Sequence, residues 1–277
     1  GIKIIKLTQE IKLDHFFNKN LNTIKWDEII SISLTSGTTS GKRKGVAHTL
    51  KQLYLSEKSI ICNTNMNLPH NELIASPADN AFWFGRVRSV LSIGGTIILM
   101  PKLINPILLL SKIQSKDLSI NALSGDTPIF NLIFNEISSS KKILQKNPLN
   151  YLSISSMKPE QKLISEIFTI LPEVKAYAGY GLTEAMRIAF NPLHKTKDST
   201  YAGKPCSEWD VKLININKEG EGEIAVRGEI LASTYFREEK LWEGKLFKNN
   251  YFKTGDLGKF ENEKLIVSGR IDDVINY

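Results

Sequence analysis

Short apolar runs alternate with longer amphipathic runs between Glu28 and Val174, and this alternation limits the folds open to the chain more than any other feature. The short runs are typical of strands, whereas the longer runs are typical of helices. Strands and helices that take turns along a chain indicate an α/β fold. The sequence therefore predicts a layered α/β core over this region.

The boundaries of the predicted elements follow from these runs. Strands are expected at 29–34, 72–76, 96–100, 120–123 and 151–154. Helices are expected at 50–63, 82–92, 106–114, 127–138 and 159–171. The last helix would carry Pro159 in its first turn, where the missing N–H costs nothing.

The pattern changes after Pro192. Short β-patterned stretches at 211–216, 222–226 and 264–267 are separated by Gly, Asn, Lys and Glu. We therefore predict two parts, an α/β core at 1–192 and a smaller β-rich subdomain at 193–277. No Pro-rich or Gly-rich linker separates them, so the two parts are expected to pack closely together.

Composition and charge narrow the class of protein. The chain has 277 residues, of which 42% are hydrophobic, enough for a substantial core. Its net charge is +7, but the lysines are spread along the chain rather than clustered with aromatic residues, so no nucleic-acid partner is expected. The basic excess suits a protein that handles anions, and the abundance of Ile, Lys and Asn is also typical of a biased genome.

Targeting signals and cysteines point to the cytoplasm. No segment approaches the length of a membrane span, and residues 1–13 lack the small-residue cleavage site of a signal peptide. Cys62 and Cys206 lie far apart and fit no metal-ligand spacing, so both are expected to be small buried groups. We therefore predict a cytoplasmic protein without a membrane span.

The segment 34–46 reads Leu-Thr-Ser-Gly-Thr-Thr-Ser-Gly-Lys-Arg-Lys-Gly-Val and follows a predicted strand. Its glycines allow positive φ and turn N–H groups toward an anion, its hydroxyls add donors, and its lysines add positive charge. The segment is typical of a phosphate-binding loop, although a flexible Ser/Gly surface loop has a similar composition. The spacing argues against a Walker loop, which reads G-x-x-x-x-G-K-[ST], because only three residues separate Gly37 from Gly41.

Further motifs follow the loop in order. They are Tyr180-Gly181-Leu182-Thr183-Glu184, Ala202-Gly203-Lys204-Pro205, Gly222–Gly228, 231–235, 251–256 and Gly269-Arg270-Ile271-Asp272-Asp273. Together with the loop, they resemble the motifs of the adenylate-forming superfamily, which contains acyl-CoA synthetases, peptide-synthetase adenylation domains and luciferases. The loop has one extra residue near Ser40 and Arg43 where the family usually has Pro, and Lys44 falls on the family lysine. The resemblance extends from about Ile29 to the end of the chain.

The resemblance implies that a carboxylic acid attacks the α-phosphorus of ATP, forming an acyl-AMP while pyrophosphate leaves. The acyl group would then pass to CoA or to the phosphopantetheine thiol of a carrier protein. By resemblance, Thr183 would contact the α-phosphate and Glu184 would hold Mg²⁺, so the implied catalytic residues are Lys44, Thr183 and Glu184. The residues implied to hold the β- and γ-phosphates are Thr35, Ser36, Gly37, Thr38, Thr39 and Lys44. Without the family, Glu184 would be an ordinary carboxylate at a helix start.

The same resemblance assigns the rest of the nucleotide site. Tyr180, with Gly181 beside it, would stack on adenine, and Asp256 and Arg270 would bind the ribose hydroxyls. Asp272 would mark the hinge that leads to the C-terminal domain. Outside the family, the same side chains would be ordinary core, turn and surface groups.

The acid pocket is implied to lie between the helix around 82–85 and the strand that leads into Tyr180, with Phe84, Gly85, Ala178 and Gly179 as lining residues. The two arginines that follow on this helix, Arg86 and Arg88, would either pair with a second carboxylate of the acid or face water. The turn at 155–158 contains no glycine, although the family often has a Gly-rich adenine-contacting turn there.

The two ends of the sequence also differ from the family pattern. The stretch before the loop is shorter than usual, and the chain stops at Tyr277, just past the hinge motif. The mobile C-terminal domain with its catalytic lysine is therefore expected to be absent from this sequence, or to be supplied as a separate partner. Two functions stay open, an AMP-forming acid–thiol ligase and a non-catalytic nucleotide- or acyl-binding module of the same fold. The sequence does not identify the acid or the thiol.

Overall fold

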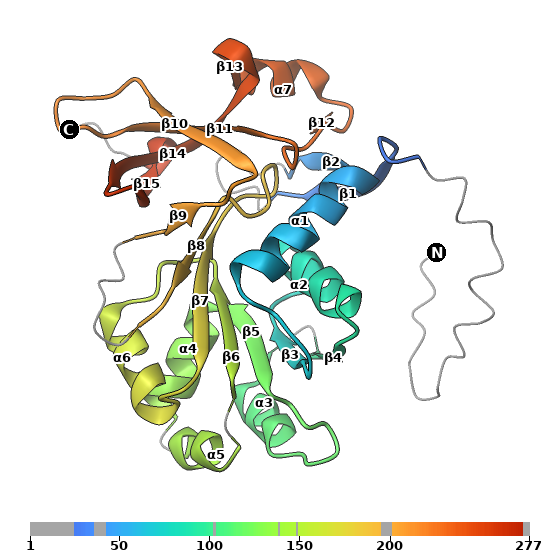
Figure 1. Cartoon of the computed structure of the whole chain (residues 1–277), viewed down its shortest axis with the longest axis vertical. Helices are drawn as coiled ribbons and strands as arrows, with labels where there is room; N and C mark the ends of the chain where they lie inside the picture. Colours follow the sequence, from blue (N-terminus) through green and yellow to red (C-terminus); the bar gives the residue numbers. More distant parts are fainter. Residues whose placement is uncertain are drawn as a thin grey trace.

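The largest sheet in the described part of the chain has seven strands and forms the centre of the α/β core (Figure 1). The structure, a computed structural model, describes residues 25–35, 43–101, 104–137, 139–147, 149–194 and 201–273. The strand order is β4-β3-β5-β6-β7-β8-β9. The strands are β3 Asn71–Ala75, β4 Thr96–Leu99, β5 Ala122–Asp126, β6 Tyr151–Ser155, β7 Lys175–Tyr180, β8 Ala189–Pro192 and β9 Lys204–Pro205. The strands from β4 to β7 are parallel, whereas β8 and β9 are antiparallel to their neighbours.

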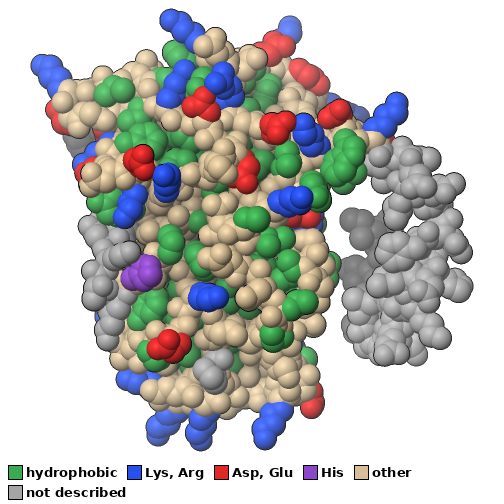
Figure 2. Space-filling view, in the orientation of Figure 1, with side chains coloured by type: hydrophobic (Ala, Val, Ile, Leu, Met, Phe, Trp, Pro, Cys, Tyr) green, Lys and Arg blue, Asp and Glu red, His purple; other side chains and the backbone are tan. Residues whose placement is uncertain are grey.

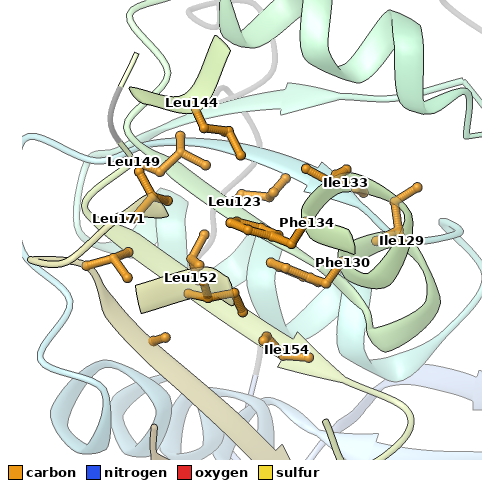
Figure 3. Packing of buried hydrophobic residues seen from close by; sticks show 14 of the residues in the cluster. Leu123, Ile129, Phe130, Ile133, Phe134, Leu144, Leu149, Leu152, Ile154 and Leu171 are labelled. Atoms are coloured by element: carbon orange, nitrogen blue, oxygen red, sulfur yellow. The ribbon is translucent and has the colours of Figure 1, made fainter. Parts of the chain in front are cut away.

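Helices cover both faces of this sheet, because its strands alternate their apolar side chains between the two faces. In β6, Leu152 and Ile154 point into one core with the helices of that face, as Figure 3 shows. Tyr151 points to the opposite face, where it joins a second core with Ile60 and Val90. The helices of the first face are α3 Pro106–Ile113, α4 Thr127–Asn131, the π-helix η3 Leu132–Glu136, α5 Ser140–Lys146 and α6 Gln161–Ile170, and those of the second face are α1 Leu50–Asn63 and α2 Ala81–Ser92.

Side-chain caps mark where α1 and α2 begin. Thr49 and Gln52 form a reciprocal capping box at the start of α1. The Asn80 side chain accepts a hydrogen bond from the Trp83 N–H at the start of α2. The buried face of α2, which packs toward the sheet, carries Gly85, Arg86, Ser89 and Val90.

The C-terminal part of the chain builds a second, β-rich layer (Figure 1). Its sheet has the order β10-β11-β14-β13, with β15 also paired to β14. Its elements are β10 Trp209–Ile214, β11 Gly222–Gly228, α7 Glu239–Lys245, β13 Leu246–Phe247, the 3₁₀ turn η4 Lys248–Asn250, β14 Tyr251–Glu261, β15 Lys264–Arg270 and the 3₁₀ turn η5 Ile271–Asp273.

A third, small sheet joins the beginning of the chain to its C-terminal part. It has the order β1-β2-β12, in which β1 is Ile29–Leu34, β2 is Gly45–Thr49 and β12 is Thr234–Tyr235. Strand β12 pairs with β2, and β9 extends the large sheet. The two predicted parts therefore share sheets, and the boundary at 192/193 stays a prediction.

The predicted layered α/β core with a smaller β-rich part is confirmed, and the differences concern details. Helix α6 begins at Gln161, so Pro159 precedes the helix instead of occupying its first turn. Strand β5 runs from Ala122 to Asp126, because the buried but polar Ser124 continues it beyond the apolar run. The expected helix at 127–138 is a short α-helix that continues as the π-helix η3.

The basic side chains are spread over the surface, as the sequence predicts. One of the two cysteines differs from its prediction. In Figure 2, Lys and Arg side chains lie scattered over the visible face with acidic residues between them. Cys206 is buried as predicted, but Cys62 is exposed near the end of α1. Among the described residues, none of the helices has the length and apolar character needed to cross a membrane. The cytoplasmic location stays a prediction.

Candidate functional site

The phosphate loop predicted from the sequence connects two antiparallel strands. Strand β1 pairs with β2, and the Thr35 N–H donates to the Lys44 carbonyl at 3.0 Å. The Lys44 N–H in turn donates to Thr35 Oγ1 at 3.1 Å, which closes the base of the loop. Because the segment leads into a strand, it differs from a Walker loop, whose Gly-Lys pair opens a helix. Four of the residues implied to hold phosphate, Ser36, Gly37, Thr38 and Thr39, lie outside the described residues.

Thr183 and Glu184 lie in the loop that follows β7. The preceding Gly181 has no room for a side chain, because a Cβ there would stand 1.6 Å from the Met186 carbonyl oxygen. Glu184 is 9% exposed, and its Oε1 accepts a hydrogen bond of 2.6 Å from the Tyr235 hydroxyl. Burial, and next the charge of Glu184, raise the pKa of Tyr235, so that this hydroxyl remains a donor. Tyr235 falls within the motif at 231–235, but its contact with Glu184 could not be predicted from that motif.

Lys44 and Glu184 both contact the Tyr235 side chain. The Lys44 Nζ lies 5.2 Å from the centroid of the Tyr235 ring, within the range of a cation–π contact. The structure therefore brings a lysine and a carboxylate from distant parts of the sequence to one aromatic residue. No group of three or more His, Cys, Asp or Glu side chains suited to a metal occurs in the part of the chain that the structure describes. A single carboxylate still fits Mg²⁺ that arrives with phosphate, because Mg²⁺ takes one or two carboxylates and fills its other positions with phosphate oxygens and water.

Tyr180, Asp256 and Arg270 form a hydrogen-bonded group between the two layers. The Tyr180 hydroxyl donates to Asp256 Oδ2 at 2.6 Å, and Arg270 Nη1 donates to Asp256 Oδ1 at 3.1 Å. Burial raises the pKa of Asp256, whereas the hydrogen bond from Tyr180 and the charge of Arg270 act in the opposite direction. The hinge candidate Asp272 lies exposed in the turn directly after Arg270. Three of the residues implied for the nucleotide site are therefore in direct contact.

A cavity of about 370 Å³ lies at the carboxyl ends of β5, β6 and β7. This is the edge of a parallel sheet at which α/β proteins bind their ligands. Predicted residues that line the cavity are Gly85, Gly179, Tyr180, Gly181 and Thr183. The cavity therefore joins the predicted nucleotide residues to part of the predicted acid pocket.

Two residues of the predicted acid pocket do not line this cavity. Phe84 is 44% exposed and packs edge-on against Trp83, while Phe82 from the same helix lines the cavity in its place. Helical spacing explains the difference, because residues three and four apart share a face and Phe82 therefore lies with Gly85. Ala178 packs into the core on the first face, because neighbouring residues of a strand point to opposite sides.

The two arginines of α2 that the sequence offered for a second carboxylate already have protein partners. Arg86 donates to Glu72 through Nε at 2.9 Å and through Nη2, and His70 Nε2 lies 2.7 Å from Glu72 Oε2. Although burial alone would raise it, Arg86 and His70 hold the pKa of Glu72 at about 2. Arg88 pairs with Glu57 at 2.9 Å. Arg86 lines the cavity, but Glu72 balances its charge.

The glycine-free turn after β6 keeps a conformation that glycine favours. Ser156 has a φ of 75°, and its hydroxyl donates to Asp126 Oδ1 at 2.8 Å. The Ser155 hydroxyl donates to the same oxygen at 3.1 Å. Asp126 and both serines line the cavity; the sequence pointed to the turn of the two serines, but no motif marked Asp126. Hydrogen bonds to Asp126 thus hold this turn without a glycine.

Comparisons with known proteins identify the family of the chain. A family model described as AMP-binding enzyme matches residues 5–236. A 2-succinylbenzoate–CoA ligase of Staphylococcus aureus (strain Newman) is 28% identical over 254 residues, which cover 89% of this chain and 48% of that protein. The chain thus spans about half the length of the curated relatives it matches.

Solved structures show the same fold. O-succinylbenzoate coenzyme A synthetase (MenE) from Bacillus subtilis, in complex with ATP and magnesium ion, has a TM-score of 0.78 and 24% identity, covering 91% of this chain and 52% of that one. ATP-bound MatB from Rhodopseudomonas palustris has a TM-score of 0.77 and 19% identity, covering 91% of this chain and 50% of that one.

Proposed function

The chain belongs to the family of AMP-binding enzymes, and from this we propose that it activates a carboxylic acid with ATP. In this reaction a carboxylate oxygen bonds to the α-phosphorus, the bond from that phosphorus to the bridging oxygen breaks, and pyrophosphate leaves. The product is an acyl-adenylate. A thiol then attacks the acyl carbon and AMP leaves, which yields a thioester.

The observation that carries the proposal is that Asp256 accepts hydrogen bonds from both Tyr180 and Arg270, while Tyr180 lines the cavity together with Thr183. The carboxylate of Asp256 offers acceptors of the kind that ribose hydroxyls need. Thr183 adds a hydroxyl donor near the position proposed for the α-phosphate. Thr183 lines a cavity large enough for a small acid, and Tyr180, which also lines it, joins Asp256 to this cavity.

The negative charge on the phosphates calls for cations and donors in fixed positions. Lys44 supplies a positive charge at the base of the phosphate loop, and Tyr235 holds the Glu184 carboxylate in place. Glu184 would hold Mg²⁺, which when bound neutralises phosphate charge in the transition state. Loss of the Glu184 charge should therefore impair adenylate formation more than nucleotide binding.

The thiol acceptor follows from the relatives rather than from a contact in the structure. The Staphylococcus aureus relative is a CoA ligase, so CoA is the acceptor we propose for this chain. A carrier-protein phosphopantetheine is the alternative acceptor, and a separate C-terminal domain is the partner that the resemblance implies. The cytoplasm is the location we propose.

A second candidate is a binding module without chemistry. The glycine-free turn with Ser156 at a φ of 75° favours it, because the turn departs from the family pattern beside the cavity. Retention of Glu184 and Asp256 favours the enzyme.

Carboxylate-dependent exchange of labelled pyrophosphate into ATP tests the proposal. We expect exchange with one class of acid, and a loss of at least a hundredfold for Glu184→Gln, by analogy with other groups that stabilise transition-state charge. The matched control is Glu173→Gln, which neutralises an exposed glutamate and should leave the rate unchanged. Nucleotide binding without exchange for any acid would support the binding module instead.

A further inference from the structure

Arg187, three residues after Glu184, places in the cavity wall a guanidinium that forms no salt bridge among the described residues. Its Nη2 atom is buried and meets no hydrogen-bond acceptor among the described residues. Burial, and next the charge of Arg86, lower the pKa of Arg187 to about 10, so the guanidinium stays charged at neutral pH. A buried polar group without a partner is costly, and such a group in a cavity wall marks a binding position.

The surrounding residues hold Arg187 in this position. Gly179 leaves room for it, because a Cβ there would stand 3.3 Å from both Cδ and Nε of Arg187. The guanidinium carbon lies 4.9 Å from the centroid of the Phe82 ring. The Arg187 carbonyl accepts a hydrogen bond of 2.7 Å from Trp209 Nε1. The side chain is thus placed by packing, while one edge of its guanidinium is free to donate.

The other charged groups of the wall are already engaged. Arg86 is balanced by Glu72, and the Asp126 carboxylate accepts hydrogen bonds from Ser155 and Ser156. Of the charged side chains that line the cavity within the described ranges, Arg187 is the one without a salt bridge or a hydrogen bond from its side chain. The charge of Asp126 acts on Arg187 in the direction that raises its pKa, but no hydrogen bond joins the two side chains among the described residues. An anion that enters the cavity therefore finds a guanidinium whose Nη2 donors are not engaged by the protein.

We propose that Arg187 binds a second carboxylate on the acid, so that this protein selects dicarboxylic acids over monocarboxylic acids. The proposal rests on the function proposed above, in which the first carboxylate reacts near Thr183. Arginine suits the role because its planar fork of donors matches a carboxylate. Away from bulk water, the attraction between the two charges is stronger than at an exposed site.

The test compares the binding of matched acids by isothermal titration calorimetry, with and without ATP. The pairs are 2-succinylbenzoate with 4-oxo-4-phenylbutanoate, which lacks the ring carboxylate, and succinate and malonate with their monoamides. We expect the unsubstituted chain to bind at least one dicarboxylate about tenfold or more tightly than its partner, as for a hydrogen bond between charged groups. Arg187→Met should reduce this preference to less than about twofold, and Arg187→Lys should restore part of it.

The controls separate recognition from folding. Arg227→Met removes an exposed arginine of the β-rich layer and should leave the preference intact. A merely structural Arg187 predicts a lower melting temperature for Arg187→Met with the preference retained, and that result would overturn the proposal. Recognition predicts an unchanged or higher melting temperature, because the substitution removes an unpaired buried charge.

The outcomes also distinguish this proposal from the proposed function. If ATP binds but no dicarboxylate is preferred or bound, the role of Arg187 is wrong while nucleotide binding stands. If a preference that depends on Arg187 appears without ATP binding, the role of Arg187 holds and the proposed activation of acids fails.

Discussion

The two sides of the cavity satisfy their charged groups in different ways. On the nucleotide side, Asp256 receives hydrogen bonds from both Tyr180 and Arg270, so these groups organise one another before any ligand binds. On the acid side, Glu72 pairs with Arg86, whereas Arg187 forms no salt bridge among the described residues and its buried Nη2 has no hydrogen-bond partner there. A paired buried arginine belongs to the framework, whereas an unpaired one is available to a ligand.

The largest effect on stability is expected when the buried pair of Arg86 and Glu72 is broken. Glu72→Gln would leave the buried Arg86 without its counter-charge and should lower the free energy of unfolding by about 3–5 kcal/mol. Urea denaturation measures this loss. Replacing both partners, as Glu72→Leu with Arg86→Met, should recover much of it. Equal stability losses for Glu72→Gln and Arg187→Met would show that the two arginines do not differ in the way described.

The next largest effect concerns pH. His48 is fully buried, and neither of its ring nitrogens has a hydrogen-bond partner among the described residues. Burial, and next the charge of Arg88, lower the pKa of His48 from 6.5 to about 4. Because the unfolded chain takes up the proton first, stability is full above pH 6.5 and is lost as the pH falls toward 4, by about 3 kcal/mol in total.

The variant His48→Leu checks this assignment. It should flatten the dependence of unfolding free energy on pH between 6.5 and about 4. The paired Glu72 titrates in a lower window, from its ordinary 4.5 down to about 2, so its contribution should remain in the variant. An unchanged slope between pH 6.5 and 4 would contradict a neutral, buried His48.

The nucleotide side is tested by Asp256→Asn. The amide keeps one acceptor oxygen but loses the charge that Arg270 and Tyr180 contact. Hydrogen bonds to charged groups contribute about 1.5–3 kcal/mol, so AMP should bind about tenfold or more weakly. Calorimetric titration with AMP measures the change. Arg187→Met is the matched control on the acid side and should leave AMP affinity within about twofold, as expected of a site that shares no partner with Asp256.

The difference between the nucleotide side and the acid side also explains which site residues could be predicted from the sequence. Tyr180, Thr183 and Glu184 lie in one contiguous motif, and Asp256 and Arg270 lie in two others, so the order of motifs was enough to group them. Their contacts with one another agree with that grouping, while their roles toward ATP stay predictions. The layered α/β fold could also be predicted, because the periodic spacing of apolar residues indicates strands and helices along the chain.

The acid side could not be predicted in the same way, because its residues come from elements with no shared motif. The rotation of α2 decides that Phe82 lines the cavity and Phe84 does not, and that rotation depends on how the buried face of α2 packs against other elements. The pairing of Arg86 with Glu72 depends on two elements meeting in space. Arg187 had one signal in the sequence, a charged residue just after the Thr183-Glu184 pair, and the absence of a partner for it emerged only from the packing.

The smallest effect is expected at the glycine-free turn. Ser156 has a φ of 75°, a conformation that costs a residue with a side chain about 1–2 kcal/mol. The hydrogen bond that its hydroxyl donates to Asp126 offsets part of this cost. Ser156→Ala removes the hydrogen bond and keeps the strain, so it should lower unfolding free energy by about 1 kcal/mol. Ser156→Gly removes both, and its stability should stay within about 0.5 kcal/mol of the unsubstituted chain. Urea midpoints of the two variants measure the difference. If the two variants were equally stable, the backbone of this turn would be unstrained, and Asp126 would hold it by hydrogen bonds alone.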